Sequence, residues 1–477
     1  MRSRPFRLVP VLAAVMLLLA PALAVAQDGV TDQDIAINTL LVFLGAVLVL
    51  FMQAGFAMLE VGLSRMKNAG AVMGKIVINL SITFIMFWAI GFSFAFGDGN
   101  GFMGSSGWFM DTSNTAVDFS SLAGYAVSFE STFFFQAVFA AVSLAIVFGT
   151  MLDRTKFGAY IAFGVLYIGL IYPIVAHWTW GGGWLAEDGF LDFAGSSIVH
   201  LQGALAALAG TLILGPRIGK FRDGKASAIP GHSIPLMVLG VIILWVGWMG
   251  FNPASFLNAV GSNFADVAVN TNLAAAAGVV GATIFSLIMF RTLDVSQMGN
   301  GAIAGLVAIT APCAFVDPWA AVLIGFIGGA LVPPIVVGID KLRVDDPVGA
   351  LPAHGVAGIW GTLAIGLFAT AERTGAREGL LLGGGGEQLW VQFYGVAATI
   401  GFTLTACLIV FAAIKLTIGL RVSEADELRG LDIAEHGMFG YPERFIEVPG
   451  AEPDSVEPVP PHTPAGAATA TSPATAS

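Results

Sequence analysis

The clearest ionisable residues within, or at the ends of, the long apolar stretches of the sequence are two histidines and two acids. His200 occurs in DFAGSSIVHLQG, His354 in GALPAHGVAG, Asp192 begins the first of these stretches, and Glu60 closes another. An ionisable group in apolar surroundings is costly unless it is paired or faces a cavity, so such groups are functional candidates. Imidazole exchanges a proton near neutral pH, so two histidines that met could relay one. A single histidine could equally be a structural group bonded to a neighbouring helix.

Aromatic residues form a second group at the ends of apolar stretches. The group comprises Phe133, Phe134, Phe135 and Phe139, then Trp178, Trp180 and Trp184 around three glycines, and Trp245, Trp248 and Phe251. An aromatic belt at the membrane interface explains most of them. Trp180 beside Gly181, and the run Phe251-Asn252-Pro253-Ala254-Ser255 at an unwound helix end, are instead typical of the lining of a vestibule.

The composition explains why these residues stand out. Of 477 residues, 56% are hydrophobic and 11% are charged, and the mean hydropathy is +0.82. A soluble domain is roughly 25% charged, so the composition excludes a soluble globule, a disordered chain and a nucleic-acid-binding protein, and it indicates a lipid bilayer. Cys313 and Cys407 both lie in apolar runs, so we expect no disulfide framework or metal-ligand cluster. No cofactor is expected either.

The apolar stretches are long enough to be membrane helices, each of which needs roughly 20 residues. Eleven can be drawn, at approximately 36–61, 69–97, 130–151, 157–176, 192–215, 234–252, 264–290, 299–316, 318–339, 349–371 and 388–415. The sequence therefore predicts an all-α polytopic membrane protein with eleven transmembrane helices.

The basic residues indicate the orientation of these helices. Outside the first 26 residues and the final tail, fourteen Lys and Arg residues fall in one alternate set of connections, and only Arg373 and Arg377 in the other. Positive residues concentrate on the cytoplasmic side. We therefore expect a multi-pass protein of the cell membrane (plasma or inner) whose first span begins outside and whose C-terminus is cytoplasmic.

The amino terminus agrees with that orientation. Arg2, Arg4 and Arg7 precede an apolar stretch and small residues near Ala26, which is the layout of a signal peptide over residues 1–26. Cleavage would leave the mature N-terminus outside. The alternative is an uncleaved first helix, although Pro10 and Pro21 interrupt it.

The region from Ser423 onward differs from the membrane domain, which we assign to residues 27–422. It contains ten acidic and two basic residues, about eight of the eleven net negative charges. Residues 423–447 are predicted to be a cytoplasmic regulatory tail that docks on the membrane domain or on a partner, or else a plain solvated segment. Residues 448–477 are rich in Pro, Ala and Thr and are predicted to be disordered.

The two histidines occupy equivalent places in spans five and ten. Five spans is an odd number, so a repeat of spans one to five by spans six to ten must be inverted in the membrane, with the eleventh helix added. Inverted repeats place equivalent residues around one central pathway. We therefore expect His200 and His354 to face each other at mid-membrane.

Eight stretches together resemble the ammonium transporter family (Amt/Mep/Rh), on the Amt side. They are AGFAMLEVGLSRMKN (54–68), FFQAVFA (134–140), HWTWGGGW (177–184), DFAGSSIVH (192–200), GWMGFNPAS (247–255), GAIAGLVAIT (301–310), RVDDPVGALPAHGVAGIWG (343–361) and GLDIAEHGMFGY (430–441). The resemblance covers residues 36–441. It implies a homotrimer in the lipid bilayer with one pore in each protomer.

The resemblance implies roles for the aromatic residues at the outer end of that pore. Phe139, Trp180 and Ser255 are similar to the site that binds the ammonium cation. Phe139 and Phe251 are similar to the stacked phenyl gate below it, with Phe135 nearby.

The same resemblance assigns the ionisable residues. Asp192 is similar to the buried carboxylate that stabilises the cation at the vestibule, and His200 and His354 are similar to the paired histidines of the pore. Two departures from the family pattern are Ser196, where many members have glycine, and Pro352, which we expect to reshape span ten locally.

The implied activity is ammonium transport, with methylammonium as an analogue. Ammonium would be bound by aromatic faces, deprotonated and conducted as ammonia through an apolar segment, while its proton passes along the histidines. The loop 216–233 and the tail 423–441 resemble contact sites for a PII signalling protein.

Three other functions compete with this interpretation. The same fold could be an ammonium sensor, or a Rh-like channel for a neutral gas; Trp180 with a hydroxyl beside it favours the binding of a cation. An enzyme is not expected, because the sequence has no nucleophile–base pair or phosphate-binding loop and no G-x-G-x-x-G after a strand pattern.

Overall fold

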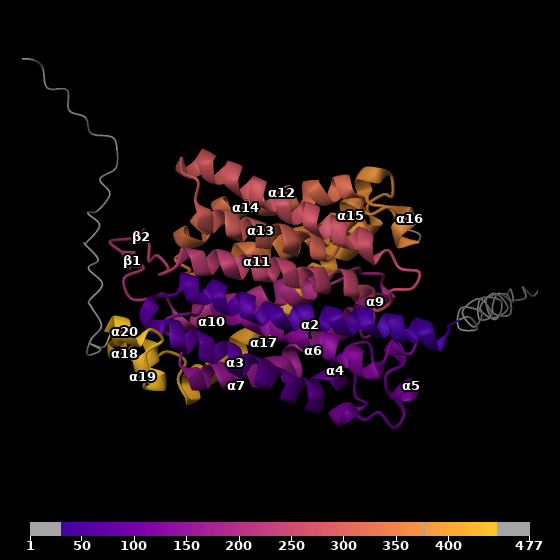
Figure 1. The fold of residues 1–477 in the computed structure, drawn as a ribbon, viewed down its shortest axis with the longest axis horizontal. Helices are drawn as coiled ribbons and strands as arrows, with labels where there is room; N and C mark the ends of the chain where they lie inside the picture. The colour runs from indigo at the N-terminus through magenta and orange to yellow at the C-terminus, as the bar shows by residue number, and fades with distance from the viewer. Residues whose placement is uncertain (1–29, 376, 446–477) are drawn as a thin grey trace, which may run out of the picture. The chain divides into compact units, whose positions relative to one another are not determined.

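The computed structural model describes residues 30–375 and 377–445, and the chain is mainly helical there (Figure 1). The predicted signal peptide, 1–26, and the predicted tail, 448–477, lie outside the described residues. Of the described residues, those up to Gly440 form one compact unit, and Tyr441 and the few that follow it belong to a second. In the second unit the structure describes the short helix α20 (Pro442–Phe445).

Within the described part of the first unit, eleven helical stretches follow one another, several of them built from consecutive segments. They are α2 (Asp32–Leu63); α3 (Ala69–Met86), η2 (Phe87–Gly91) and α4 (Phe92–Phe96); α6 (Phe129–Gly149); α7 (Phe157–Leu166), η5 (Tyr167–Ile171) and α8 (Tyr172–Thr179); η6 (Ser196–Leu201) and α10 (Gln202–Leu214); α11 (Ile234–Phe251); α12 (Phe264–Phe290); α13 (Val295–Thr310); α14 (Pro318–Lys341); η8 (Leu351–Val356) and α15 (Ala357–Phe368); and α17 (Glu387–Thr417).

Ten of these stretches are long and apolar enough to cross a membrane among the described residues. The remaining one, α13, has only 16 residues, but from Asn300 to its end every residue is buried. Because α13 packs among other helices, it does not have to match the bilayer thickness along a lipid-facing surface. The eleven helices lie where the sequence predicts them, and the prediction of a polytopic all-α protein is confirmed.

Short elements connect these helices. They are η1 (Met66–Asn68), η3 (Trp108–Met110), α5 (Thr115–Asp118), η4 (Ser120–Leu122), α9 (Trp184–Glu187), β1 (Phe221–Arg222) and β2 (Lys225–Ala226), η7 (Pro253–Phe256), α16 (Ala371–Thr374), η9 (Leu380–Leu382), α18 (Glu424–Arg429) and α19 (Leu431–His436). The strands β1 and β2 pair antiparallel as a small hairpin.

Small residues allow the helices to approach closely. Figure 1 shows α2 beside α11, and α12 beside α13 and α14. At the contact of α12 with α14, a Cβ atom added to Gly329 would lie 1.9 Å from the carbonyl oxygen of Gly278. Large apolar side chains such as Ile288 and Ile409 point outward instead. Close packing through glycine and an apolar exterior are what a bilayer favours.

The end of α10 meets the segment that leads into η8. The guanidinium of Arg217, just after α10, donates to both carboxylate oxygens of Asp345 at 2.9 and 3.0 Å. The guanidinium of Arg154 donates to the carbonyls of Gly215 and Asp345 at 3.0 and 3.2 Å. The C-terminal end of α10 therefore lies close to the N-terminal end of η8. The two segments run in opposite directions, as an inverted repeat requires.

Helices α18 and α19 pack against this same end of the unit, which we call the tail side. The Glu427 carboxylate accepts a hydrogen bond from the backbone N–H of Ile218 at 2.7 Å. The Asp432 carboxylate accepts from the backbone N–H groups of Gly70 and Ala71 at 3.1 and 2.8 Å, in the first turn of α3. The segment after α17 is therefore docked on the membrane domain of its own chain.

Candidate functional site

The carboxylate of Asp192 holds the backbone that leads to His200. It accepts four hydrogen bonds from the backbone N–H groups of residues 195–198, at 2.7 to 3.1 Å, and a fifth from the Ser197 hydroxyl at 2.5 Å. Gly195 begins this turn with φ of +112°. The segment that follows, η6, is a π-helical turn, a form often found at functional sites.

A second aspartate, Asp346, does the same before His354. Its carboxylate accepts from the backbone N–H groups of residues 348–351 at 2.8 to 3.3 Å, and the π-helical η8 follows. The sequence analysis did not select Asp346. The signal was present, because each aspartate stands eight residues before a histidine.

The two histidines meet in the interior. Nδ1 of His200 lies 3.2 Å from Nδ1 of His354, and their ring planes differ by 19°. His200 is fully buried and His354 is 6% exposed. A hydrogen bond between two Nδ1 atoms requires one to carry a proton and the other to accept, so the pair shares a single proton along that line. The predicted meeting of these residues is observed.

Phenyl rings cover the histidine pair on the side away from the tail. The rings of Phe139 and Phe251 are stacked with centroids 3.9 Å apart and planes at 20°. Phe135 lies beside this stack, 4.5 Å from the ring of Phe139. The ring of His200 lies 5.5 Å below Phe251. A solute approaching the histidines from this side meets the stacked rings first.

Trp180 lies next to the phenyl rings, and Ser255 contacts the backbone of Phe251. The ring of Trp180 lies 6.0 Å from that of Phe139, and its Nε1–H donates to the backbone carbonyl of Asp192 at 2.9 Å. The hydroxyl of Ser255 donates to the carbonyl of Phe251 at 2.8 Å, which leaves its oxygen able to accept. The structure thus brings together the rings of Phe135, Phe139, Trp180 and Phe251, with Ser255 bonded to the backbone of Phe251.

Two tryptophans contradict the interfacial-belt interpretation. Trp248 is fully buried, its Nε1–H donates to the hydroxyl of Thr310 at 2.9 Å, and its ring stacks on His200 with centroids 5.2 Å apart. Trp178 is 3% exposed and donates to the carbonyl of Phe102. The interfacial-belt interpretation failed for these two residues because the spacing of aromatic residues and their position along a helix do not reveal which face of the helix packs inward.

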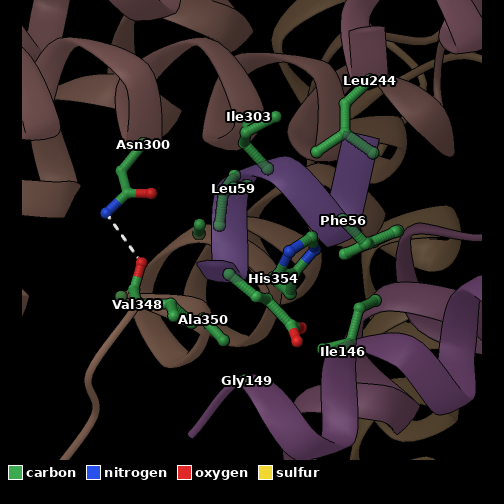
Figure 2. Close-up of a pocket in the computed structure, with 13 residues that line it drawn as sticks. Phe56, Leu59, Ile146, Gly149, Leu244, Asn300, Ile303, Val348, Ala350 and His354 are labelled. Carbon is green, nitrogen blue, oxygen red and sulfur yellow. Dashed lines mark hydrogen bonds between the residues drawn. The ribbon is translucent and has the colours of Figure 1, made fainter. Parts of the chain in front are cut away.

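A small cavity lies next to His354, on the far side of the pair from the phenyl rings. In Figure 2 the imidazole of His354 lies at the centre of the lining residues, near Phe56 and Ile146. The cavity has a volume of about 20 Å³ and is also lined by Glu60 and Asn300. The Asn300 amide donates to the carbonyl of Val348 at 3.0 Å, as the dashed line in Figure 2 marks.

The two departures noted in the sequence have different effects. The hydroxyl of Ser196 donates to the carbonyl of Val307 and accepts from the N–H of Ala311, both at 2.6 Å, so it ties η6 to the end of α13. Pro352 lies in the π-helical η8. The equivalent η6 is π-helical without a proline, so Pro352 is not required for that geometry.

Comparison with known proteins agrees with this arrangement. The profile of the Ammonium Transporter Family matches residues 40–441. The chain belongs to this family. It is 43% identical to the ammonium transporter Amt2 of Archaeoglobus fulgidus over 415 residues, covering 83% of this chain and 86% of that protein. It is 40% identical to a putative ammonium transporter of Synechocystis sp. over 450 residues, covering 92% and 97%.

Solved structures of the family share the fold. One described as a Sensor Amt Protein superposes with a TM-score of 0.78 at 37% identity, covering 85% of this chain and 99% of that one. Mep2 of Candida albicans superposes with a TM-score of 0.75 at 29% identity, covering 82% and 87%. The chain is therefore a multi-span membrane protein with the Amt/Mep fold.

Proposed function

We propose that this protein transports ammonium by separating it into ammonia and a proton inside the membrane. The observation that carries the proposal is the hydrogen-bonded pair His200 and His354, buried directly below the stacked rings of Phe139 and Phe251. Family membership and the names of the relatives support the substrate.

The outer residues would bind the cation before it loses its proton. Aromatic faces attract a cation by roughly 0.5–2 kcal/mol each. Phe139 and Trp180 supply such faces, and the Ser255 oxygen can accept one N–H hydrogen bond. Asp192 acts mainly by positioning other groups and not by binding the cation directly. Its carboxylate oxygens accept hydrogen bonds from residues 195–198, and its backbone carbonyl accepts one from the Trp180 ring.

Beyond the phenyl rings an intact ammonium cation would incur the full free-energy penalty of desolvation. That cost far exceeds what the vestibule supplies, since burying an isolated ion costs tens of kcal/mol in the limit of a dry interior. Deprotonation removes it: ammonium gives its proton towards His200 and neutral ammonia crosses the apolar segment. Potassium has no proton to give, so the same barrier excludes it.

We propose further that the tail side is cytoplasmic, as the distribution of Lys and Arg predicts, and that the protein is a homotrimer in the cell membrane. The loop 216–233 and the tail would then form one surface for a PII signalling protein. Contact between Ile218 and Glu427 supports a single surface. Arg217 and Lys220 are committed to ion pairs, which leaves the exposed Arg222 and Lys225 of the β1–β2 hairpin to face a partner.

Ammonium-triggered current in reconstituted vesicles tests the transport proposal. We expect wild-type protein to give a saturable current, and His200→Ala and His354→Ala each to reduce it at least tenfold. If both variants kept wild-type current and still rejected potassium, the proton relay would be wrong. Binding of methylammonium without any flux would instead favour a sensor, the function named for one structural relative. Unsaturable flux that survives Trp180→Ala would favour a channel for neutral gas.

A further inference from the structure

A buried acid lies at the inner end of the histidine pathway. Glu60 is in the last turn of α2, is 3% exposed, and lines the same cavity as His354. Its carboxylate has no hydrogen bond or ion pair within 30–375 and 377–445. A buried carboxylate is normally satisfied by several donors, as Asp192 and Asp346 are. Glu60 therefore differs from both and is the only carboxylate that lines this cavity.

The helices around Glu60 bring few charged groups to it. Lys75 on α3, itself 3% exposed, lies within electrostatic range, although no contact within 4.0 Å joins the two side chains. The phenol of Tyr160 on α7 is also within electrostatic range. On α6, a Cβ added to Gly149 would lie 3.4 Å from Oε1 of Glu60. Groups within electrostatic range of Lys75 in turn are Asp153, Arg154 and Glu435.

The cavity between Glu60 and His354 has room for water. A water molecule needs roughly 10–15 Å³ of such space and two to four polar partners, and this cavity has about 20 Å³. The polar residues that line it are His354, Glu60 and Asn300, and the Asn300 amide nitrogen is bonded to the carbonyl of Val348. One water molecule here would connect the end of the histidine pair to a carboxylate.

We propose that Glu60 is the proton acceptor at the tail-side end of the pore, receiving through this water-sized cavity the proton that leaves His354. The inference rests on the proposed function and extends it to the exit of the proton. The buried Lys75 compensates the negative charge of Glu60 while the carboxylate is deprotonated.

The transfer balances in two steps. An N–H bond of the protonated His354 breaks and an O–H bond forms on Glu60, which leaves a neutral imidazole and a neutral carboxylic acid. The acid then gives its proton to ammonia arriving through the pore, forming ammonium and regenerating the carboxylate. No other reactant is needed, and the net result is one ammonium ion moved.

A purely structural role is the competing explanation, with Glu60 present only to neutralise Lys75. The two roles predict different results for a double substitution. Glu60→Gln leaves Lys75 buried without a counter-charge, which destabilises any protein in which the pair is structural. Glu60→Gln with Lys75→Met removes both charges, so it restores stability without restoring a proton acceptor.

The experiment measures ammonium-triggered current in vesicles, with apparent melting temperature and trimer content measured on the same preparations. We expect Glu60→Gln and Glu60→Gln/Lys75→Met to lower the current at least tenfold, the double variant at near wild-type melting temperature. Glu60→Asp keeps a carboxylate and is expected to stay within threefold of wild type. Glu424→Gln, which removes an exposed tail-side charge, is the matched control and is expected to match wild type.

Wild-type current in the double variant, or in Glu60→Gln alone, would overturn the proposal. Should the double variant fail to fold, the comparison of Glu60→Gln with Glu60→Asp decides: equal loss in both also overturns it. These outcomes leave the transport proposal standing if His354→Ala has lost its current. Full current in both His200→Ala and His354→Ala would instead contradict the relay itself.

Discussion

Asp346 holds the π-helical turn that carries His354, through four backbone N–H groups that point at one carboxylate. Asp192 does so for His200, in a segment that runs in the opposite direction. Each histidine is thus fixed by an acid near the start of its own half-helix, one at each end of the pore. We therefore expect the Nδ1–Nδ1 contact, which is 3.2 Å long, to depend on both aspartates.

Asp346→Ala is expected to damage stability and transport together. The change leaves four N–H groups without an acceptor, and an unsatisfied buried donor costs roughly 1–3 kcal/mol. We expect a lower melting temperature and an ammonium current reduced at least tenfold. Glu372→Ala removes an exposed acid and is the control. Wild-type current in Asp346→Ala would show that the histidine pair does not need this support.

Gly195 is required by both its conformation and its neighbours. Its φ is +112°, and an added Cβ would lie 2.6 Å from Cγ2 of Val199 and 3.1 Å from Cη2 of Trp180. Gly195→Ala is therefore expected to displace Trp180 and to weaken methylammonium uptake at least tenfold, with a raised KM. Gly401→Ala has no atom within 4 Å of the new Cβ and should match wild type. Unchanged KM in Gly195→Ala would contradict a role of this turn in the vestibule.

The stacked rings should control what reaches the histidines. Phe251→Ala removes the ring that lies 3.9 Å from Phe139 and 5.5 Å from His200, and so admits water to the pair. We expect the ratio of ammonium to potassium current to fall at least tenfold while protein abundance stays unchanged. Phe393→Ala, on the outward face of α17, is the control. Potassium rejection as strong as in wild type would rule out the rings as the selective barrier.

The sequence alone was sufficient to predict the features that depend on the order of apolar and ionisable residues along the chain. Apolar length located the eleven helices, and the cost of burying an imidazole singled out His200 and His354. Contacts made by the backbone were harder to predict. Asp346 lies in a connection, where an acid is ordinary, and its function became visible only when four N–H groups turned toward it. Trp248 was misassigned because an aromatic residue near a helix end can face lipid or the interior with the same sequence spacing.

The tail-side pair of Arg217 and Asp345 should make stability depend on acidity. Burial alone would raise the pKa of the Asp345 carboxyl, but the hydrogen bonds from Arg217 and the charge of Arg154 hold that pKa below its ordinary value. A carboxyl whose pKa is lower in the folded state stabilises the protein above its unfolded pKa, about 3.9, and this contribution is lost as the pH falls through the folded pKa.

Asp345→Asn is therefore expected to lower the melting temperature at pH 7, since removing one partner of a buried pair costs about 3–5 kcal/mol. The difference from wild type should persist down to about pH 4 and narrow below it, where the wild-type carboxyl is protonated as well. Thermal unfolding of both proteins in detergent, from pH 7 to below about pH 4, measures the difference in melting temperature and the pH at which it narrows. A difference that already narrowed near pH 6 would mean that Arg217 does not hold the carboxylate ionised, and that the end of α10 is fixed to η8 by its backbone contacts alone.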